Sequence, residues 1–223
     1  MERETGTFTQ ERERVETVRR EEQKGMYAMA GGSATEALLG AAAVVLSILG
    51  LLNILPQYMA SVAVIAVGVS LLVGGGALAA RFSRAVPSTE RASAAETVQG
   101  GVAMQAFAGT AGVVLGILAL LGNLPATLLA VALIVLGGGF LLSGSATAQI
   151  NAMIAHATGR SEFFSGSMGI EVIVGLGAVV LGILALAGFS PAILILAGTL
   201  SLGAGVLLSG SALAGRAISM FAR

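Results

Sequence analysis

Several residue types that carry chemistry are missing from this chain. It contains neither cysteine nor tryptophan, and it has a single histidine. Every acidic residue is a glutamate, so aspartate is absent too. Disulfides, thiolate metal sites and cysteine nucleophiles are therefore excluded, and a Ser–His–Asp triad cannot form.

Charge is also scarce, and apolar residues dominate. Charged residues make up 11% of the 223 residues, apolar ones 56%, and the mean hydropathy is +0.91. A soluble domain of this size could not hide so much apolar surface from water. We therefore expect an all-α membrane protein, because a helix of about 20 apolar residues crosses the hydrocarbon core. Six transmembrane helices are predicted, near residues 37–55, 57–80, 106–124, 126–148, 172–189 and 192–214.

An internal repeat organises these helices. Residues 36–79, 105–148 and 171–214 align without a gap, and the last two copies are identical at more than half of the aligned positions. Repeats indicate one supersecondary unit that packs against its own copies. Because each copy spans the membrane twice, all three run in the same direction, which predicts three parallel-repeat hairpins with pseudo-threefold symmetry.

The repeat divides the chain into seven segments. An N-terminal arm (1–30) precedes repeat 1 (31–82), and a connector (83–104) leads to repeat 2 (105–148). A second connector (149–170), repeat 3 (171–215) and a tail (216–223) follow. Each hairpin turns at a proline, which suits the first turn of a helix, after Asn or Gly, which tolerate a left-handed backbone. The turn prolines are Pro56, Pro125 and Pro191.

The positions of the basic residues predict the orientation. Eleven of the 12 lie in the N-terminal arm, the connectors or the tail, the twelfth, Arg81, lies at the very end of repeat 1, and none lies in a hairpin turn. By the positive-inside rule we expect both termini in the cytoplasm, with the protein in the cytoplasmic (inner) membrane of a prokaryote. The first 25 residues are too charged for a secretory signal peptide. Within the arm, alternating Glu and Arg from Thr7 to Lys24 predict a charged helix. That helix is interpreted as a solubilising arm, or as one that docks on a partner or on anionic lipid.

One polar column runs through the repeat. It consists of Glu36, Gln105 and Glu171. Polar side chains inside membrane helices are candidates for function, so a ring at the cytoplasmic mouth of a transporter or channel is one interpretation. The other is helix capping, because carboxylates at a helix start satisfy free N–H groups. Few other polar residues lie in the helix interiors, which argues against an open aqueous pore.

Glycine forms the second set of columns. Small residues recur every three or four positions, a spacing that lets membrane helices approach closely. We assign these glycines to helix packing rather than to phosphate binding, because no GK[ST] follows them. The columns contain Gly40, Gly109 and Gly175; Gly112, Gly116 and Gly182; and Gly68, Gly137 and Gly203.

The remaining titratable groups offer little for catalysis. His156 stands alone near the expected membrane surface, and Glu90 and Glu96 fall in a connector. Membrane enzymes usually cluster His, Asp or Glu at one face. We therefore expect no enzymatic activity, no metal, no cofactor and no nucleic-acid partner.

Glycine-rich hairpins that turn at a proline resemble the HdeD-type acid-resistance membrane proteins of bacteria. The resemblance covers residues 36–214 and is carried by Gly-Ile-Leu before the turn and by the glycines late in the second helix, as in residues 125–144. It implies an inner-membrane protein linked to acid stress, with no catalytic residues to transfer. The long charged arm and the Glu/Gln/Glu column depart from that family.

Three functions remain open at this level. The first is a non-enzymatic multi-pass protein acting in acid tolerance or membrane integrity, with the lipid bilayer as its main partner. The second is a small transporter or channel that uses the polar column. The third is an accessory subunit of a larger membrane complex, or a homo-oligomer, that docks through its arm and glycine faces.

Overall fold

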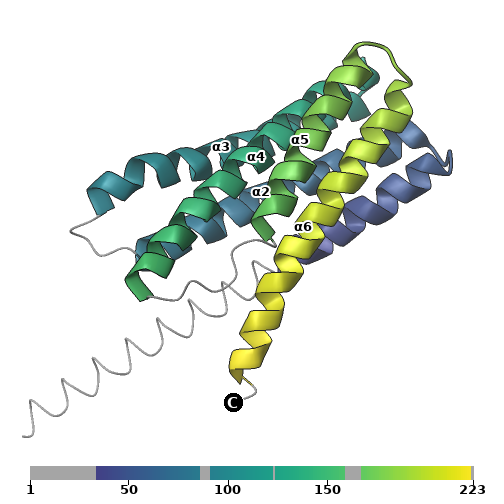
Figure 1. The fold of residues 1–223 in the computed structure, drawn as a ribbon. Coiled ribbons are helices and arrows are strands. Elements are labelled where there is room, and N and C mark those ends of the chain that lie inside the picture. The colour runs from purple at the N-terminus through teal and green to yellow at the C-terminus, as the bar shows by residue number, and fades with distance from the viewer. Residues whose placement is uncertain (1–33, 86–90, 123, 159–166, 222–223) are drawn as a thin grey trace, which may run out of the picture.

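The chain forms a bundle of long helices (Figure 1). The computed structural model describes residues 34–85, 91–122, 124–158 and 167–221. The predicted N-terminal arm lies outside these residues. The first helix is described over Ala34–Leu51, and five more follow: α2 (Pro56–Ala85), α3 (Arg91–Leu120), α4 (Pro125–Thr158), α5 (Ser167–Leu186) and α6 (Pro191–Phe221).

Five of these helices are long and apolar enough to cross a membrane. They are the first helix, α2, α3, α4 and α6. The sixth, α5, has a shorter apolar stretch, Glu171–Leu186, although the whole helix has 20 residues and so is about 30 Å long. The described residues are thus helical apart from the turns between helices, as expected for a multi-pass membrane protein.

The connectors are more helical than their polarity indicates. We expected a connector over residues 83–104, but α3 runs without a break from Arg91 into the apolar segment. Similarly, α4 continues to Thr158 and α6 continues to Phe221. These extensions are rich in alanine, which is the strongest helix former, so their helical propensity persists after their hydropathy has fallen.

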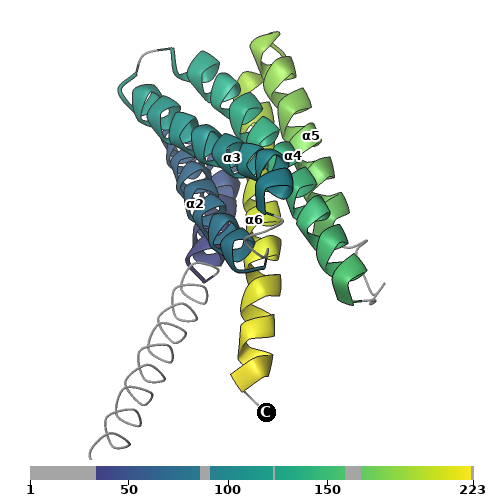
Figure 2. The same cartoon turned by 90° about the vertical axis from the view of Figure 1, so that its left-hand side faces the viewer.

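The three hairpin turns share one backbone conformation. Asn53, Gly122 and Gly188 have positive φ angles of 64°, 85° and 90°. In each turn this residue donates its N–H to a carbonyl three residues earlier, at 3.0–3.1 Å. The next helices begin at Pro56, Pro125 and Pro191, and the turns lie together at one end of the bundle (Figures 1 and 2).

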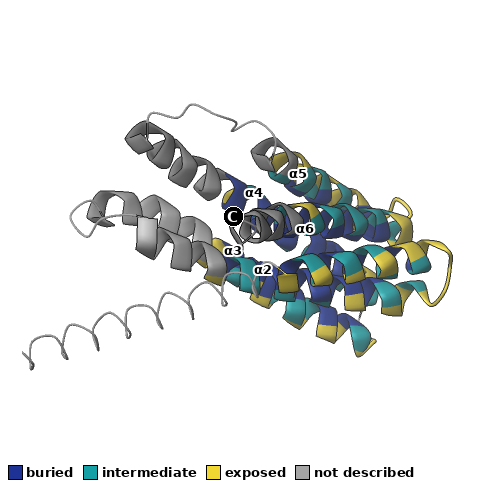
Figure 3. Ribbon diagram, turned by 90° about the horizontal axis from the view of Figure 1, so that it is seen from below, coloured by how far each residue is buried: buried dark blue, intermediate teal, exposed yellow. Residues whose placement is uncertain are grey.

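The second helices of the hairpins form the centre. α2, α4 and α6 contact one another, and the ribbon of the bundle is coloured as buried mainly where the helices lie against one another (Figure 3). Aligned positions of these three helices provide four successive layers that are almost fully buried: Ala60, Leu129 and Ile195; Val64, Leu133 and Thr199; Val67, Leu136 and Leu202; and Leu71, Phe140 and Val206. All but Thr199 are apolar.

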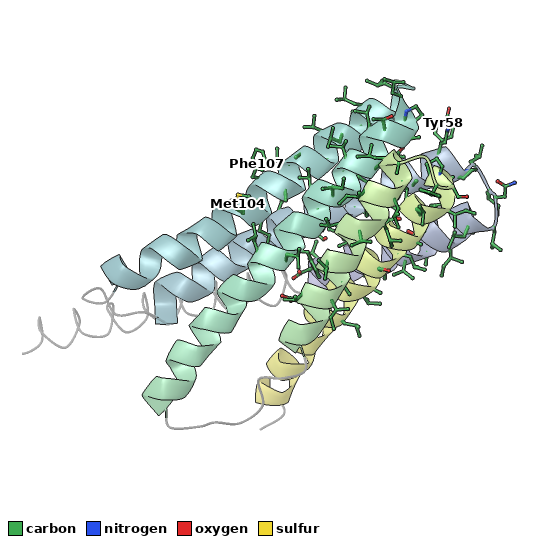
Figure 4. All side chains as sticks on the ribbon, turned by 45° about the horizontal axis from the view of Figure 1, so that its top comes forward. Tyr58, Met104 and Phe107 are labelled. Carbon is green, nitrogen blue, oxygen red and sulfur yellow. The ribbon has the colours of Figure 1, made fainter. Side chains whose placement is uncertain are left out.

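The first helices of the hairpins lie outside this centre and carry most of the exposed apolar side chains. Met104 and Phe107, for example, project from α3, and Phe107 is 65% exposed (Figure 4). An apolar surface of this extent is not tolerated in water but is normal against lipid tails. It therefore supports a membrane-embedded protein.

Glycine pairs bring each outer helix against an inner helix of a different hairpin. A Cβ on Gly109 of α3 would lie 2.6 Å from the carbonyl oxygen of Gly68 on α2. A Cβ on Gly175 of α5 would lie 2.8 Å from that of Gly137 on α4. In the first helix, a Cβ on Gly40 would lie 2.9 Å from the carbonyl oxygen of Gly203 on α6. Only glycine permits such close backbone approach.

The other predicted packing glycines also lie at helix contacts. A Cβ on Gly116 or Gly182 would approach an isoleucine and a backbone carbonyl of the inner helix, Ile65 and Ser61 in one case and Ile134 and Ala130 in the other. Gly112 instead faces Leu136 of its own hairpin.

Candidate functional site

The polar column lies at the end of the bundle opposite the turns. Glu36 is 8% exposed and Gln105 is 6% exposed, so both are buried. Glu171 is half-buried. The inner helices present Gly74, Ser143 and Ser209 at this level, one layer beyond Leu71, Phe140 and Val206. Small residues on the inner helices leave room for the larger polar side chains of the outer ones.

Glu36 and Gln105 come together over α2. A Cβ on Gly74 would lie 3.0 Å from Glu36 Oε1 and 3.1 Å from Gln105 Nε2. The carboxyl group of the first helix and the amide group of α3 therefore meet at the same point on α2. A side chain at position 74 would therefore contact both groups tightly, and they would have to shift slightly to accept it.

Glu171 rests on a different helix. A Cβ on Gly144 of α4 would lie 3.3 Å from both the Cβ and the Oε2 of Glu171. Glu171 and Gln105 thus share the same kind of support, a glycine on the inner helix of the preceding hairpin. The structure brings Glu36 and Gln105 together at Gly74 and supports Glu171 separately.

The capping interpretation of the column is wrong for Gln105. Capping requires a position at the helix start, where N–H groups lack intrahelical acceptors. Gln105 lies near the middle of α3, because that helix begins at Arg91. Glu171 lies beyond the first turn of α5, which contains no acidic residue.

One atom of the column lacks a hydrogen-bond partner. Gln105 Oε1 is buried and has no donor within reach among the described residues. A buried carbonyl oxygen without a donor costs about 1–3 kcal/mol, and in folded proteins such atoms are normally satisfied by protein, water or an ion. Glu36 differs, since it has an interaction of its own.

Most serine hydroxyl groups inside the bundle donate hydrogen bonds to backbone carbonyls of their own helix. Ser70, Ser143 and Ser209 each donate to the carbonyl three residues earlier, at 2.7–3.1 Å. Ser61 and Ser201 do the same four residues back, at 2.8 and 2.9 Å. Because these hydrogens point to the helix backbone, they do not form a polar track through the bundle.

One hydroxyl pair joins two helices. Ser47 of the first helix and Thr199 of α6 lie 3.0 Å apart, both fully buried. The Thr199 hydroxyl also lies 3.0 Å from the carbonyl oxygens of Ile195 and Leu196, to which it donates. Either hydroxyl can donate in the pair. This hydrogen bond ties the first hairpin to the last, and the alignment alone did not reveal it.

The remaining titratable groups do not form a metal-binding cluster in the described part of the chain. Within the described residues, no three His, Cys, Asp or Glu side chains gather where they could hold a metal. His156 lies in α4 and Glu96 in α3, but their side chains are outside the described ones, and Glu90 is outside the described residues altogether.

Comparison with known proteins identifies no relative. No family model, no curated protein and no solved structure matches this chain.

Proposed function

We propose that this chain is a non-enzymatic protein of the prokaryotic cytoplasmic membrane that supports membrane integrity under acid stress without conducting ions. The observation that carries the proposal is the sealed interior of the bundle. Four layers of buried side chains, apolar except for Thr199, lie between the inner helices. Conduction needs polar groups along the whole depth of a pore, and these four layers contain a single polar residue, Thr199.

Three further observations support the orientation, the repeat symmetry and the stress role in this proposal. In the sequence no basic residue lies in a hairpin turn, so by the positive-inside rule we infer that the end opposite the turns faces the cytoplasm. The three glycine contacts link aligned positions of the three repeats, as expected for hairpins related by a pseudo-threefold axis. The resemblance to acid-resistance proteins supplies the stress role.

The test measures both survival and permeability. In a deletion strain we expect lower survival at acid pH and faster collapse of the internal pH, both restored by the wild-type gene. Liposomes that contain the purified protein should leak protons no faster than empty liposomes. Unchanged acid survival of the deletion strain would refute the stress role, and a proton leak through the purified protein would refute the closed bundle.

A second function, a small transporter, is favoured by one observation, the buried Glu36–Gln105 pair at one end of the bundle. Ionisable groups inside membrane proteins often mark substrate paths. A transporter would have to open the apolar layers during its cycle. Solute flux into liposomes that falls in both Glu36→Gln and Gln105→Leu variants would favour transport over a closed bundle.

A further inference from the structure

α2 and α3 extend beyond the polar column at the end of the bundle opposite the turns. α2 runs to Ala85, eleven residues past Gly74, and α3 begins at Arg91, fourteen residues before Gln105. At 1.5 Å per residue these extensions are about 16 and 21 Å long. The described part of the first helix begins at Ala34, close to the level of the column, so it does not run along the extensions.

Helical register continues two faces of the column onto these extensions. Seven residues make about two turns of a helix, so Arg81 lies on the face of α2 that carries Gly74. Fourteen residues make about four turns, so Arg91 lies on the face of α3 that carries Gln105. Glu36 of the first helix approaches α2 and α3 on these same faces. The two arginines therefore continue the surface beside which the first helix begins.

The surface made by these two faces combines apolar residues with positive charge. We call it the extension face and define it by four residues in the register of the polar column, Leu78, Arg81, Arg91 and Val98. Glu96 lies about two and a half turns from the level of the column, on the opposite side of α3. An occupant of the extension face should therefore carry apolar and acidic groups.

The N-terminal arm has this pattern. The sequence predicts a helix over Thr7–Lys24, and residues that recur in steps of three and four share one face of a helix. Such a series contains three apolar residues and two glutamates: Phe8, Glu11, Val15, Val18 and Glu22. No lysine or arginine belongs to the series. Glu13, by contrast, falls on the opposite face of the predicted helix.

Chain length and charge favour the arm on this surface rather than on lipid. Residues 25–33 separate the predicted helix from Ala34, and a segment of this length spans up to about 30 Å, which exceeds the length of either extension. Anionic lipid attracts segments rich in Lys and Arg, whereas residues 1–30 contain seven Glu and six Lys or Arg. Two of those glutamates, Glu11 and Glu22, would also lie on the face turned toward the lipid.

We propose that the N-terminal arm docks on the extension face of its own chain. Phe8, Val15 and Val18 pack on the apolar residues of that face, and Glu11 and Glu22 pair with its two arginines. The arm is thus an intramolecular ligand that covers the ends of α2 and α3 opposite the turns. A partner that binds the extension face must first displace the arm.

Crosslinking of the full-length protein tests the docking, because the chain has no cysteine of its own. Val18→Cys and Val98→Cys, introduced together, should be joined rapidly within one chain by a short bifunctional maleimide, both in detergent and in phosphatidylcholine vesicles. Thr17→Cys with Val98→Cys is the matched control, since Thr17 lies away from the apolar series. High ionic strength should slow the link, because salt screens exposed ion pairs. Equal rates for the two pairs would overturn the proposed docking face.

Charge reversal tests the role of the arginines. In the double-cysteine background, Glu11→Arg with Glu22→Arg should slow crosslinking about fivefold, in keeping with the modest strength of exposed ion pairs. Adding Arg81→Glu and Arg91→Glu should restore the rate, and this swap keeps the number of basic residues constant. Glu13→Arg is the control in the arm and should leave the rate unchanged. A loss that the compensating pair does not restore would refute pairing with the two arginines.

The same crosslinking distinguishes the other occupants. A link that joins two chains, seen as a doubled mass on a denaturing gel, would place the arm on a second copy and overturn the intramolecular proposal. Slow linking in every condition, together with protection of the arm from protease on phosphatidylglycerol vesicles, would make lipid the partner of the arm and would also overturn it. Slow linking without such protection would refute docking altogether.

Discussion

At the scale of single residues, the packing of this bundle depends on which glycines face a neighbouring backbone. Gly137 and Gly138 are adjacent on α4 but differ in surroundings. A Cβ on Gly137 would lie 2.8 Å from the carbonyl oxygen of Gly175, whereas one on Gly138 would meet nothing within 4 Å. Adjacent positions on a helix point in different directions, so only one of the two can lie in the contact.

This contrast predicts opposite effects of the same substitution. Gly137→Ala should lower the free energy of unfolding by about 1–3 kcal/mol, the usual cost of overpacking. Gly138→Ala should be neutral or stabilise by up to about 1 kcal/mol, because alanine has the higher helix propensity. Reversible unfolding in mixed micelles, followed by circular dichroism, measures both. Equal losses in the two variants would show that Gly137 is not at a tight contact.

A residue-scale prediction also applies to the turns. Gly122 adopts a φ of 85° with open space around its Cβ position, so Gly122→Ala carries only the backbone cost of a left-handed residue, about 1–2 kcal/mol. Asn53→Gly at the equivalent turn should be neutral within about 0.5 kcal/mol, since both residues tolerate this conformation. The same unfolding measurement applies. A loss at position 53 as large as at 122 would indicate that the Asn53 side chain itself stabilises its turn.

At the scale of helices, the contact between the first helix and α6 differs from the equivalent contacts in the other hairpins. The Ser47–Thr199 hydrogen bond lies in this contact. At the positions that align with Ser47, α3 and α5 carry Gly116 and Gly182, which pack against isoleucine. The pair therefore adds a polar interaction to a contact that otherwise consists of glycine packing. Hydrogen bonds between membrane helices contribute about 0.6 kcal/mol on average.

A double-mutant cycle measures this contribution. Ser47→Ala, Thr199→Val and the double variant should give a coupling of about 0.6 kcal/mol, and no more than about 1.7 kcal/mol. Ser201→Ala is the matched control on α6, because its hydroxyl donates within its own helix to Ala197. Coupling between positions 47 and 201 as large as between 47 and 199 would contradict a specific hydrogen bond.

At the scale of the whole molecule, the sequence predicted the helices better than it predicted the site. Apolar length and the three prolines were enough to place the hairpins, since both depend on local chemistry. Hydropathy could not reveal that the connector before Gln105 is helical, so the capping interpretation failed there. Alignment predicted a ring of three equal residues. It could not predict that Glu36 and Gln105 meet at Gly74 while Glu171 rests on Gly144, because that depends on how the helices pack in three dimensions.

Orientation in the membrane is the remaining whole-molecule property, and the absence of cysteine makes it directly testable. Phe189→Cys places a thiol in an exposed position of the turn before α6, and Ser93→Cys places one in the first turn of α3. Because no basic residue lies in a hairpin turn of the sequence, the positive-inside rule predicts that the turns face outward, and we expect a membrane-impermeant maleimide to label Phe189→Cys in intact cells. Ser93→Cys should react only after the membrane is permeabilised. The reverse pattern would put the termini and the Glu36–Gln105 site on the outside, where an acid medium would reach the site directly.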